Sequence, residues 1–161
     1  MPKLYLLLGG NLGDRTLYLQ QARASIATQV GQITRSSKLY ETAAWGKTDQ
    51  PAFLNQVLEV QTALTPEQVL PSINAIEQEL GRVRQEHWGA RVIDIDILFY
   101  DNLVLQTQRL TIPHPQLHLR RFTLLPLAEL APELVHPVLG KSIKELLEEC
   151  GDALEVQVFG E

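Results

Sequence analysis

The chain has 161 residues and a hydrophobic fraction of 45%, which suits a single domain over residues 1–161 with a sizeable core. A formal net charge of -5 argues against a general nucleic-acid binder and against a polybasic membrane surface, because both depend on a basic face. The single cysteine cannot form an internal disulfide, no apolar run approaches membrane-spanning length, and no signal-peptide pattern follows Met1, so we expect a cytoplasmic protein.

The first third of the chain alternates strand-like and helix-like segments. Residues 4–9 form an apolar run that predicts a strand, and Asp14 is a suitable N-cap for an amphipathic helix after it. Residues 33–42 and 53–63 are strand-like, and residues 43–52 between them predict a loop because they contain Gly, Asp and Pro. This part therefore reads as strand, helix and two further strands.

A second helix is predicted to begin at Thr65-Pro66, with Thr as cap and Pro in the first helical position, and to end at Gly81. Pro71 lies inside this pattern, where a proline removes a backbone donor and clashes with the preceding turn. We expect either a kink at Pro71 or a true helix start near Ser72.

The remaining elements extend the same alternation. Asp101-Asn102 predicts a tight turn before residues 103–105, which we interpret as a hairpin, although the usual glycine is absent. A polar loop, a strand, two short helices and an edge strand are predicted at residues 82–90, 91–98, 123–130, 142–150 and 155–159. The order predicts an α+β fold with a ferredoxin-like βαββαβ core plus extra strands and helices, in which helices pack on a mainly antiparallel sheet.

Two aspartates stand on the strand predicted at residues 91–98. Side chains of a strand alternate between its faces, so Asp94 and Asp96 share one face and the isoleucines between and around them share the other. Same-face Cα atoms lie roughly 6 to 7 Å apart, which lets both carboxylates reach a pair of divalent cations. The alternative is a solvated face of an amphipathic strand, but Asp is depleted in strands and neighbouring like charges repel.

Basic side chains precede and follow this strand. Six of the 14 Lys and Arg residues fall between Arg82 and Arg121, and guanidinium groups bind phosphate oxygens in a bidentate way. Beside a Mg²⁺-binding pair, Arg82, Arg84 and Arg91 indicate a nucleotide triphosphate site. His114 lies between two prolines that fix its backbone, which makes a phosphate-contacting or proton-handling role plausible; pairing with His118 on zinc is rejected because no third ligand is evident.

Other residues suggest a site for a flat heterocycle. Phe53 and Asn55 are two apart on a predicted strand, so a ring and an amide point the same way, and Phe122 can supply the opposite face of an aromatic sandwich. Residues 9–13 lack the lysine of a Walker loop and the spacing of a dinucleotide fingerprint. We interpret them as a tight turn that lines the site.

In order and spacing, these segments resemble the 6-hydroxymethyl-7,8-dihydropterin pyrophosphokinases of folate biosynthesis. The matching pieces are residues 8–14, Tyr40-Glu41-Thr42, residues 49–55, Glu77, residues 81–84, 88–91 and 94–97, and Pro113-His114 followed by Arg120 and Phe122. The resemblance implies that ATP donates a pyrophosphoryl group to the hydroxymethyl oxygen of the reduced pterin, leaving AMP.

The resemblance also implies residue roles. Asp94 and Asp96 would hold two Mg²⁺ ions, with Arg82 and Arg91 as further catalytic residues. Contacts to ATP, the co-substrate, would come from Glu77, Arg82, Arg84, Trp88, Arg91, Ile97, His114 and Arg120. The pterin would meet Thr42, Ala44, Trp45, Phe53, Asn55 and Phe122. We expect a monomer that binds these small molecules, without nucleic acid or membrane.

The chain departs from the family pattern at some positions, none of them a predicted metal ligand: Gly10, Ala43, Ala44, Phe53, Pro115 and Arg121. We expect these to alter loop dynamics and fine substrate contacts, with the reaction unchanged. Two alternatives remain: a two-metal nucleotidyltransferase, which would release pyrophosphate, and a non-catalytic pterin- or nucleotide-binding module.

Overall fold

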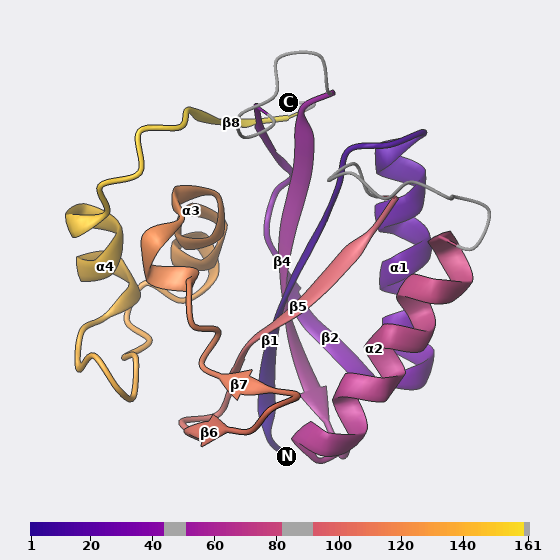
Figure 1. The fold of residues 1–161 in the computed structure, drawn as a ribbon, viewed down its shortest axis with the longest axis horizontal. Coiled ribbons are helices and arrows are strands. Elements are labelled where there is room, and N and C mark those ends of the chain that lie inside the picture. The colour runs from indigo at the N-terminus through magenta and orange to yellow at the C-terminus, as the bar shows by residue number, and fades with distance from the viewer. Residues whose placement is uncertain (44–50, 82–91, 160–161) are drawn as a thin grey trace.

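A computed structural model describes residues 1–43, 51–81 and 92–159, and within them an antiparallel sheet of six strands forms the middle layer (Figure 1). The strands run in the order β5-β1-β4-β3-β8. β2 also pairs with β4, along residues 58–62, whereas β3 pairs with residues 53–55 of the same strand. Their bounds are β1 Lys3–Gly10, β2 Gly31–Ser36, β3 Tyr40–Thr42, β4 Phe53–Thr62, β5 Asp94–Tyr100 and β8 Val156–Val158. The placement of β1 between β4 and β5 is consistent with the predicted βαββαβ plan.

Helices cover both faces of the sheet. α1 (Arg15–Gln29) and α2 (Pro66–Gly81) lie on one face, and α3 (Arg121–Leu130) and α4 (Ile143–Glu149) lie on the other (Figure 1). Alternate residues of β1 therefore enter different cores: Leu4, Leu6 and Leu8 belong to the core under α1 and α2, whereas Tyr5 and Leu7 belong to the core under α3 and α4. The α+β class with helices on an antiparallel sheet is confirmed. None of the described helices is both long and apolar enough to cross a membrane.

α2 begins at Pro66, so the alternative start near Ser72 is wrong. Thr65 Oγ1 accepts a hydrogen bond from the Gln68 amide at 3.2 Å, and the Gln68 side chain accepts one from the Thr65 amide at 2.9 Å. This reciprocal cap fixes the first turn. Pro71 lies inside the continuous helix on its exposed side. The carbonyl of Glu67, also an exposed residue, loses its helical partner there.

The prediction of a hairpin after β5 is also wrong, because the strand that follows the turn does not pair with β5. Asp101 has a φ of 48° and makes the expected turn, but the next strand, β6 (Leu105–Gln106), pairs with β7 (Thr111–Ile112). The free edge of β5 is occupied by other groups: Glu77 Oε2 accepts the Ile95 amide at 2.6 Å, and the His114 amide donates to the Leu98 carbonyl at 3.0 Å. The Ile95 donor and the Leu98 acceptor are thus satisfied without a returning strand.

The C-terminal elements match their predictions closely. Ser142 caps α4 in a reciprocal arrangement with Glu145, and β8 pairs with β3 at the edge of the sheet. A short 3-10 helix, η1 (Leu117–Leu119), precedes α3.

Candidate active site

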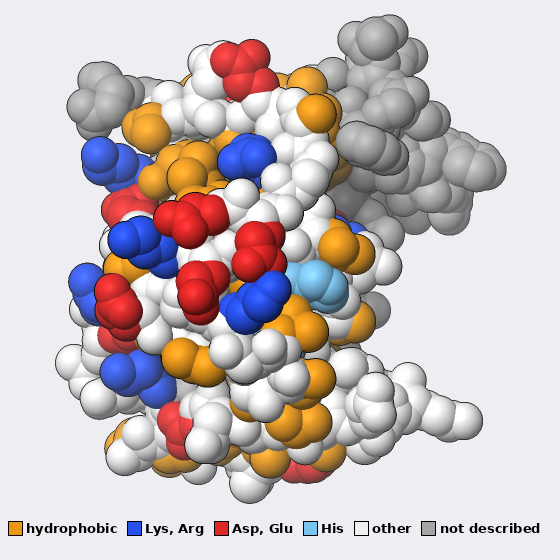
Figure 2. All heavy atoms as spheres, turned by 90° about the vertical axis from the view of Figure 1, so that its left-hand side faces the viewer, with side chains coloured by type: hydrophobic (Ala, Val, Ile, Leu, Met, Phe, Trp, Pro, Cys, Tyr) orange, Lys and Arg blue, Asp and Glu red, His pale blue; other side chains and the backbone are white. Residues whose placement is uncertain are grey.

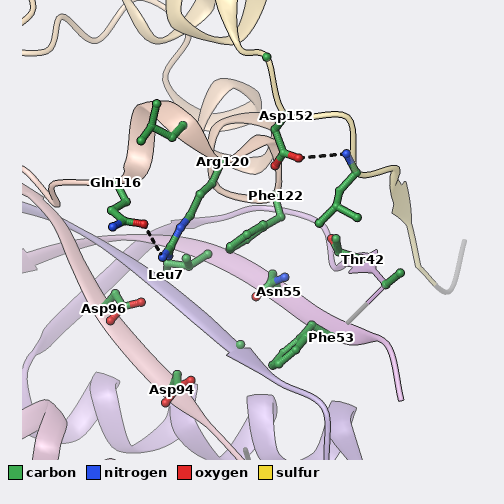
Figure 3. A pocket seen from close by; sticks show the side chains of 15 residues that line it. Leu7, Thr42, Phe53, Asn55, Asp94, Asp96, Gln116, Arg120, Phe122 and Asp152 are labelled. Atoms are coloured by element: carbon green, nitrogen blue, oxygen red, sulfur yellow. Dashed lines mark hydrogen bonds between the residues drawn. The ribbon is translucent and has the colours of Figure 1, made fainter. Parts of the chain in front are cut away.

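A cavity of about 690 Å³ opens on the face of the sheet that carries α3 and α4 (Figure 3). Its lining comes from five parts of the chain that lie far apart in sequence. These are Leu7 and Gly9 of β1; Thr42 of β3 and Ala43 after it, with Phe53 and Asn55 of β4; Asp94 and Asp96 of β5; Gln116, Leu119, Arg120 and Phe122 around η1 and α3; and Gly151, Asp152 and Leu154 after α4.

The two aspartates share one face of β5 and line the cavity together (Figure 3). Asp94 lies opposite Gly9 and Asp96 opposite Leu7 in the ladder with β1. Ile95 and Ile97 are buried in the core on the other side of the sheet. Strand periodicity therefore predicted this pair correctly.

The donor set of the pair fits Mg²⁺. Within the described ranges, no group of three or more His, Cys, Asp or Glu side chains is placed to hold a metal ion. Mg²⁺ often binds one or two carboxylates and completes its octahedron with water and substrate phosphates, so it does not need a further protein ligand. A site of two aspartates beside an open cavity suits such an ion.

Aromatic rings and polar groups gather at one end of the cavity. Figure 3 shows the Asn55 amide between the rings of Phe53 and Phe122. The Thr42 hydroxyl is buried and has no hydrogen-bond partner among the described residues. Because a buried polar group without a hydrogen bond is costly, this hydroxyl is available to bond with the polar edge of a ligand. This end can hold a flat heterocycle by stacking and hydrogen bonds.

Gly9 leaves room for Asn55. Gly9 and Gly10 are the last residues of β1, so they belong to a strand and the predicted turn is confined to the residues after them. Gly9 stands opposite Asn55 in the ladder, and a Cβ at this position would overlap the Asn55 amide oxygen. Gly9 lines the cavity, as was expected of the glycine segment.

Cationic and imidazole groups stand near the aspartates. The Arg120 guanidinium donates to Gln116 Oε1 at 3.0 Å and lies 5.5 Å from the centre of the Phe122 ring. Burial lowers the pKa of His114, Asp96 opposes this by raising it, and Arg120 lowers it further, so the net effect favours the neutral imidazole. Its Nδ1 accepts the Gln116 amide at 3.2 Å, which assigns the proton to Nε2.

The surface around this site carries both signs of charge. Viewed from the α3–α4 side, acidic and basic side chains are interspersed over the face (Figure 2). Among the described residues, the positive charge at Arg120 therefore acts at short range beside the two carboxylates and is not part of a broad basic surface.

The predicted site residues fall into three groups. The cavity brings together Thr42, Phe53, Asn55, Asp94, Asp96, Arg120 and Phe122. His114 interacts electrostatically with Asp96 but does not line the cavity, Glu77 bonds to the β5 backbone, and the Ile97 side chain is in the opposite core. The predictions for Ala44, Trp45, Arg82, Arg84, Trp88 and Arg91 lie outside the described residues.

Sequence reasoning missed part of the lining. Leu7, Gln116 and Leu119 carry no chemical signature that distinguishes them from core or surface residues. Gly151, Asp152 and Leu154 lie about a hundred residues from β3 and β4, beside which the structure places them, and no local sequence pattern predicts this contact.

Comparison with known proteins agrees with this architecture. A family model described as 7,8-dihydro-6-hydroxymethylpterin-pyrophosphokinase (HPPK) matches residues 5–132. The chain belongs to the HPPK family. A relative from Aquifex aeolicus, named 2-amino-4-hydroxy-6-hydroxymethyldihydropteridine pyrophosphokinase, is 42% identical over 145 residues, which cover 90% of each chain. One of the same name from Methylorubrum extorquens is 43% identical over 148 residues, covering 91% of this chain and 92% of the relative.

Solved structures share the HPPK fold. A Plasmodium falciparum HPPK-DHPS, crystallised with pterin and p-hydroxybenzoate, superposes with a TM-score of 0.74 at 20% identity and covers 92% of this chain but 41% of that protein. At this identity the likeness concerns the fold alone.

Proposed function

We propose that this chain transfers the pyrophosphoryl group of ATP to the hydroxymethyl oxygen of 6-hydroxymethyl-7,8-dihydropterin, producing AMP and the dihydropterin diphosphate in folate biosynthesis. The observation that carries the proposal is the shared cavity, in which a pair of co-facing carboxylates adjoins a slot of two aromatic rings and an amide. Membership of the HPPK family supports the same reaction.

The pterin end would use Phe53 and Phe122 as the stacking faces. Asn55 and the unpartnered Thr42 hydroxyl would satisfy the polar edge of the ring. Ala44 and Trp45 are proposed as further contacts on the basis of the family resemblance. Together these groups would fix the hydroxymethyl oxygen relative to the aspartates.

The phosphate end would use Asp94 and Asp96 to hold two Mg²⁺ ions. When bound there, Mg²⁺ would supply positive charge that neutralises the triphosphate of ATP. Arg120, which lines the cavity, and His114, which interacts with Asp96, are proposed as further phosphate contacts on the basis of the family resemblance. Further ATP contacts are proposed for Glu77, Arg82, Arg84, Trp88, Arg91 and Ile97, with Arg82 and Arg91 acting on the transferring phosphates.

The reaction needs positioning and charge neutralisation more than a protein nucleophile. The acceptor oxygen attacks the β-phosphorus in line, and the bond from that phosphorus to the oxygen bridging it to the α-phosphate breaks, which leaves AMP. Residues around the acceptor would exclude water, because water would compete as an acceptor and screen the charges. We also propose that the protein works as a cytoplasmic monomer.

Product analysis tests this function. With ATP, Mg²⁺ and hydroxymethyl-dihydropterin, mass spectrometry should detect AMP and the pterin diphosphate. Asp94→Ala and Asp96→Ala should each lower turnover by several orders of magnitude while the fold survives, because each removes a ligand of the metals.

The matched control is Glu148→Gln, which removes an exposed carboxylate on α4 and should leave turnover unchanged. Release of pyrophosphate with a nucleotidylated pterin would identify a nucleotidyltransferase instead. Binding of both ligands without any turnover would identify a non-catalytic module.

A further inference from the structure

The chain crosses from α4 to the sheet edge through residues 150–159, which we call the strap (Figure 1, yellow). Three strap residues, Gly151, Asp152 and Leu154, line the cavity. Farther along, Val156 of the strap lies opposite Thr42 in the ladder between β8 and β3. The strap thus forms one wall of the cavity beside the groups proposed to meet the pterin.

Arg121 fastens the beginning of the strap. Its amide donates to Asp152 Oδ2 at 3.1 Å, its Nε donates to the Asp152 carbonyl at 3.1 Å, and its Nη2 donates to the Cys150 carbonyl at 3.4 Å. The other Asp152 oxygen, Oδ1, accepts the Leu154 amide at 3.0 Å. Both carboxylate oxygens are therefore engaged in holding the backbone that carries Leu154.

The far end of the strap is fastened by β8 and by Phe159. The Phe159 amide donates to the Leu39 carbonyl at 2.8 Å, and the Arg15 guanidinium lies 5.1 Å from the centre of the Phe159 ring. Arg15 also donates to Glu41 Oε2 and to the Ala52 carbonyl, both at 2.8 Å. The same guanidinium therefore joins the strap to the residue immediately before Phe53.

The position of the strap indicates which substrate it meets. Figure 3 shows Asp152 beside Phe122, on the side of the cavity away from Asp94 and Asp96. A half-buried leucine on this wall offers apolar contact and no charge, which suits a heterocycle and gives nothing to a triphosphate.

We infer that Leu154 is a pterin-contacting residue of the cavity and that Asp152, clasped by Arg121, is a positioning residue that holds it there. This inference rests on the proposed function and deepens it, because it assigns part of the substrate specificity to the strap. The ordered strap presents Leu154 before substrate arrives, which lowers the entropic cost of closing the site around a flat ring.

Steady-state kinetics with each substrate varied separately test the inference. Leu154→Ala should raise the KM for hydroxymethyl-dihydropterin about tenfold, as expected for lost apolar contact in a substrate pocket, and leave the KM for ATP within about twofold. Leu154→Met should restore most of the affinity because it refills the volume without a polar group. Asp152→Ala should raise the same KM, and Asp152→Asn should raise it less because the amide oxygen still accepts one bond.

The matched control is Val158→Ala on the same strap, at a side chain that is 41% exposed and outside the cavity lining. It should leave both KM values unchanged, and thermal unfolding should show that each variant is folded. An unchanged pterin KM in Leu154→Ala, or equal increases for pterin and ATP, would overturn the inference. Because wild-type turnover is measured in the same assay, failure of the proposed reaction would be recognised separately by the absence of AMP.

Discussion

Gly9 illustrates how a missing side chain shapes the pocket. It is a strand residue without a left-handed φ, so the turn chemistry of glycine does not explain it. The requirement comes from Asn55, whose amide oxygen occupies the space that a Cβ at position 9 would need. A glycine here permits close approach of the amide to the β1 backbone.

We therefore expect Gly9→Ala to displace the Asn55 amide and to raise the KM for the pterin about tenfold or more, because a hydrogen-bonding group of the pocket is misplaced. Kinetics with varied pterin would measure the change. Gly81→Ala is the matched control, since a Cβ there meets no described residue within 4 Å. An unchanged pterin KM in Gly9→Ala would mean that Asn55 does not need its present position.

At the scale of single elements, α2 contains an interior proline, Pro71, that is not needed to form the helix. The cap between Thr65 and Gln68 starts the helix ahead of Pro71, and Pro71 is exposed. Replacing it should restore the missing backbone hydrogen bond. Pro71→Ala should raise the free energy of unfolding by about 1–2 kcal/mol, the helix-propensity gain reduced by the greater freedom of the unfolded chain.

Urea denaturation would measure this gain as a higher midpoint at constant slope. The comparison variant is Asn74→Ala, also exposed on α2, for which propensity alone predicts a gain of about 0.5 kcal/mol. A lower midpoint for Pro71→Ala would show that the proline stabilises the helix.

The strand β5 shows what sequence can predict and where it fails. The shared face of Asp94 and Asp96 was predictable because side-chain alternation is a local property of the backbone. The partner of the next strand could not be predicted, because Glu77 and His114 bond to β5 residues 18 and 16 positions away in the sequence. Turn residues indicate where a chain reverses without specifying which edge it joins.

For the whole molecule, a buried carboxylate ties the sheet together across three strands. Glu59 of β4 accepts the Tyr5 hydroxyl of β1 at 2.7 Å and the Thr34 hydroxyl of β2 at 2.8 Å. Burial opposes its ionisation, but these two hydrogen bonds, with Lys3 and Arg35, outweigh burial and lower the pKa of Glu59. Folding therefore favours the charged form, which stabilises the protein above the unfolded pKa of about 4.3.

Glu59→Gln should destabilise the fold at pH 7 by about 1–2 kcal/mol, because a neutral acceptor replaces a charged one. The difference from wild type should shrink as the pH falls below about 4.3 and through the lowered pKa of the folded state, since wild-type Glu59 then becomes protonated. Thermal unfolding across this pH range measures it, with Glu148→Gln as an exposed comparison. A difference that stays constant with pH would contradict the role of the charge.

The overall plan was predictable from the alternation of elements, but the cavity was predictable only in part. Phe53, Asn55 and the aspartates were found because each lies on a strand with a regular face. Asp152 and Leu154 were not predicted, because their position depends on hydrogen bonds that Arg121 and β3 make with a segment distant in sequence. Long-range packing of irregular backbone leaves no periodic trace in a sequence.

The strap begins at Cys150, the single cysteine of the chain, which is free and partly accessible. A thiol-reactive dye or nitroxide would therefore attach at one defined point without any engineered cysteine. Placed where the strap leaves α4, such a probe would let spectroscopy follow this wall during turnover.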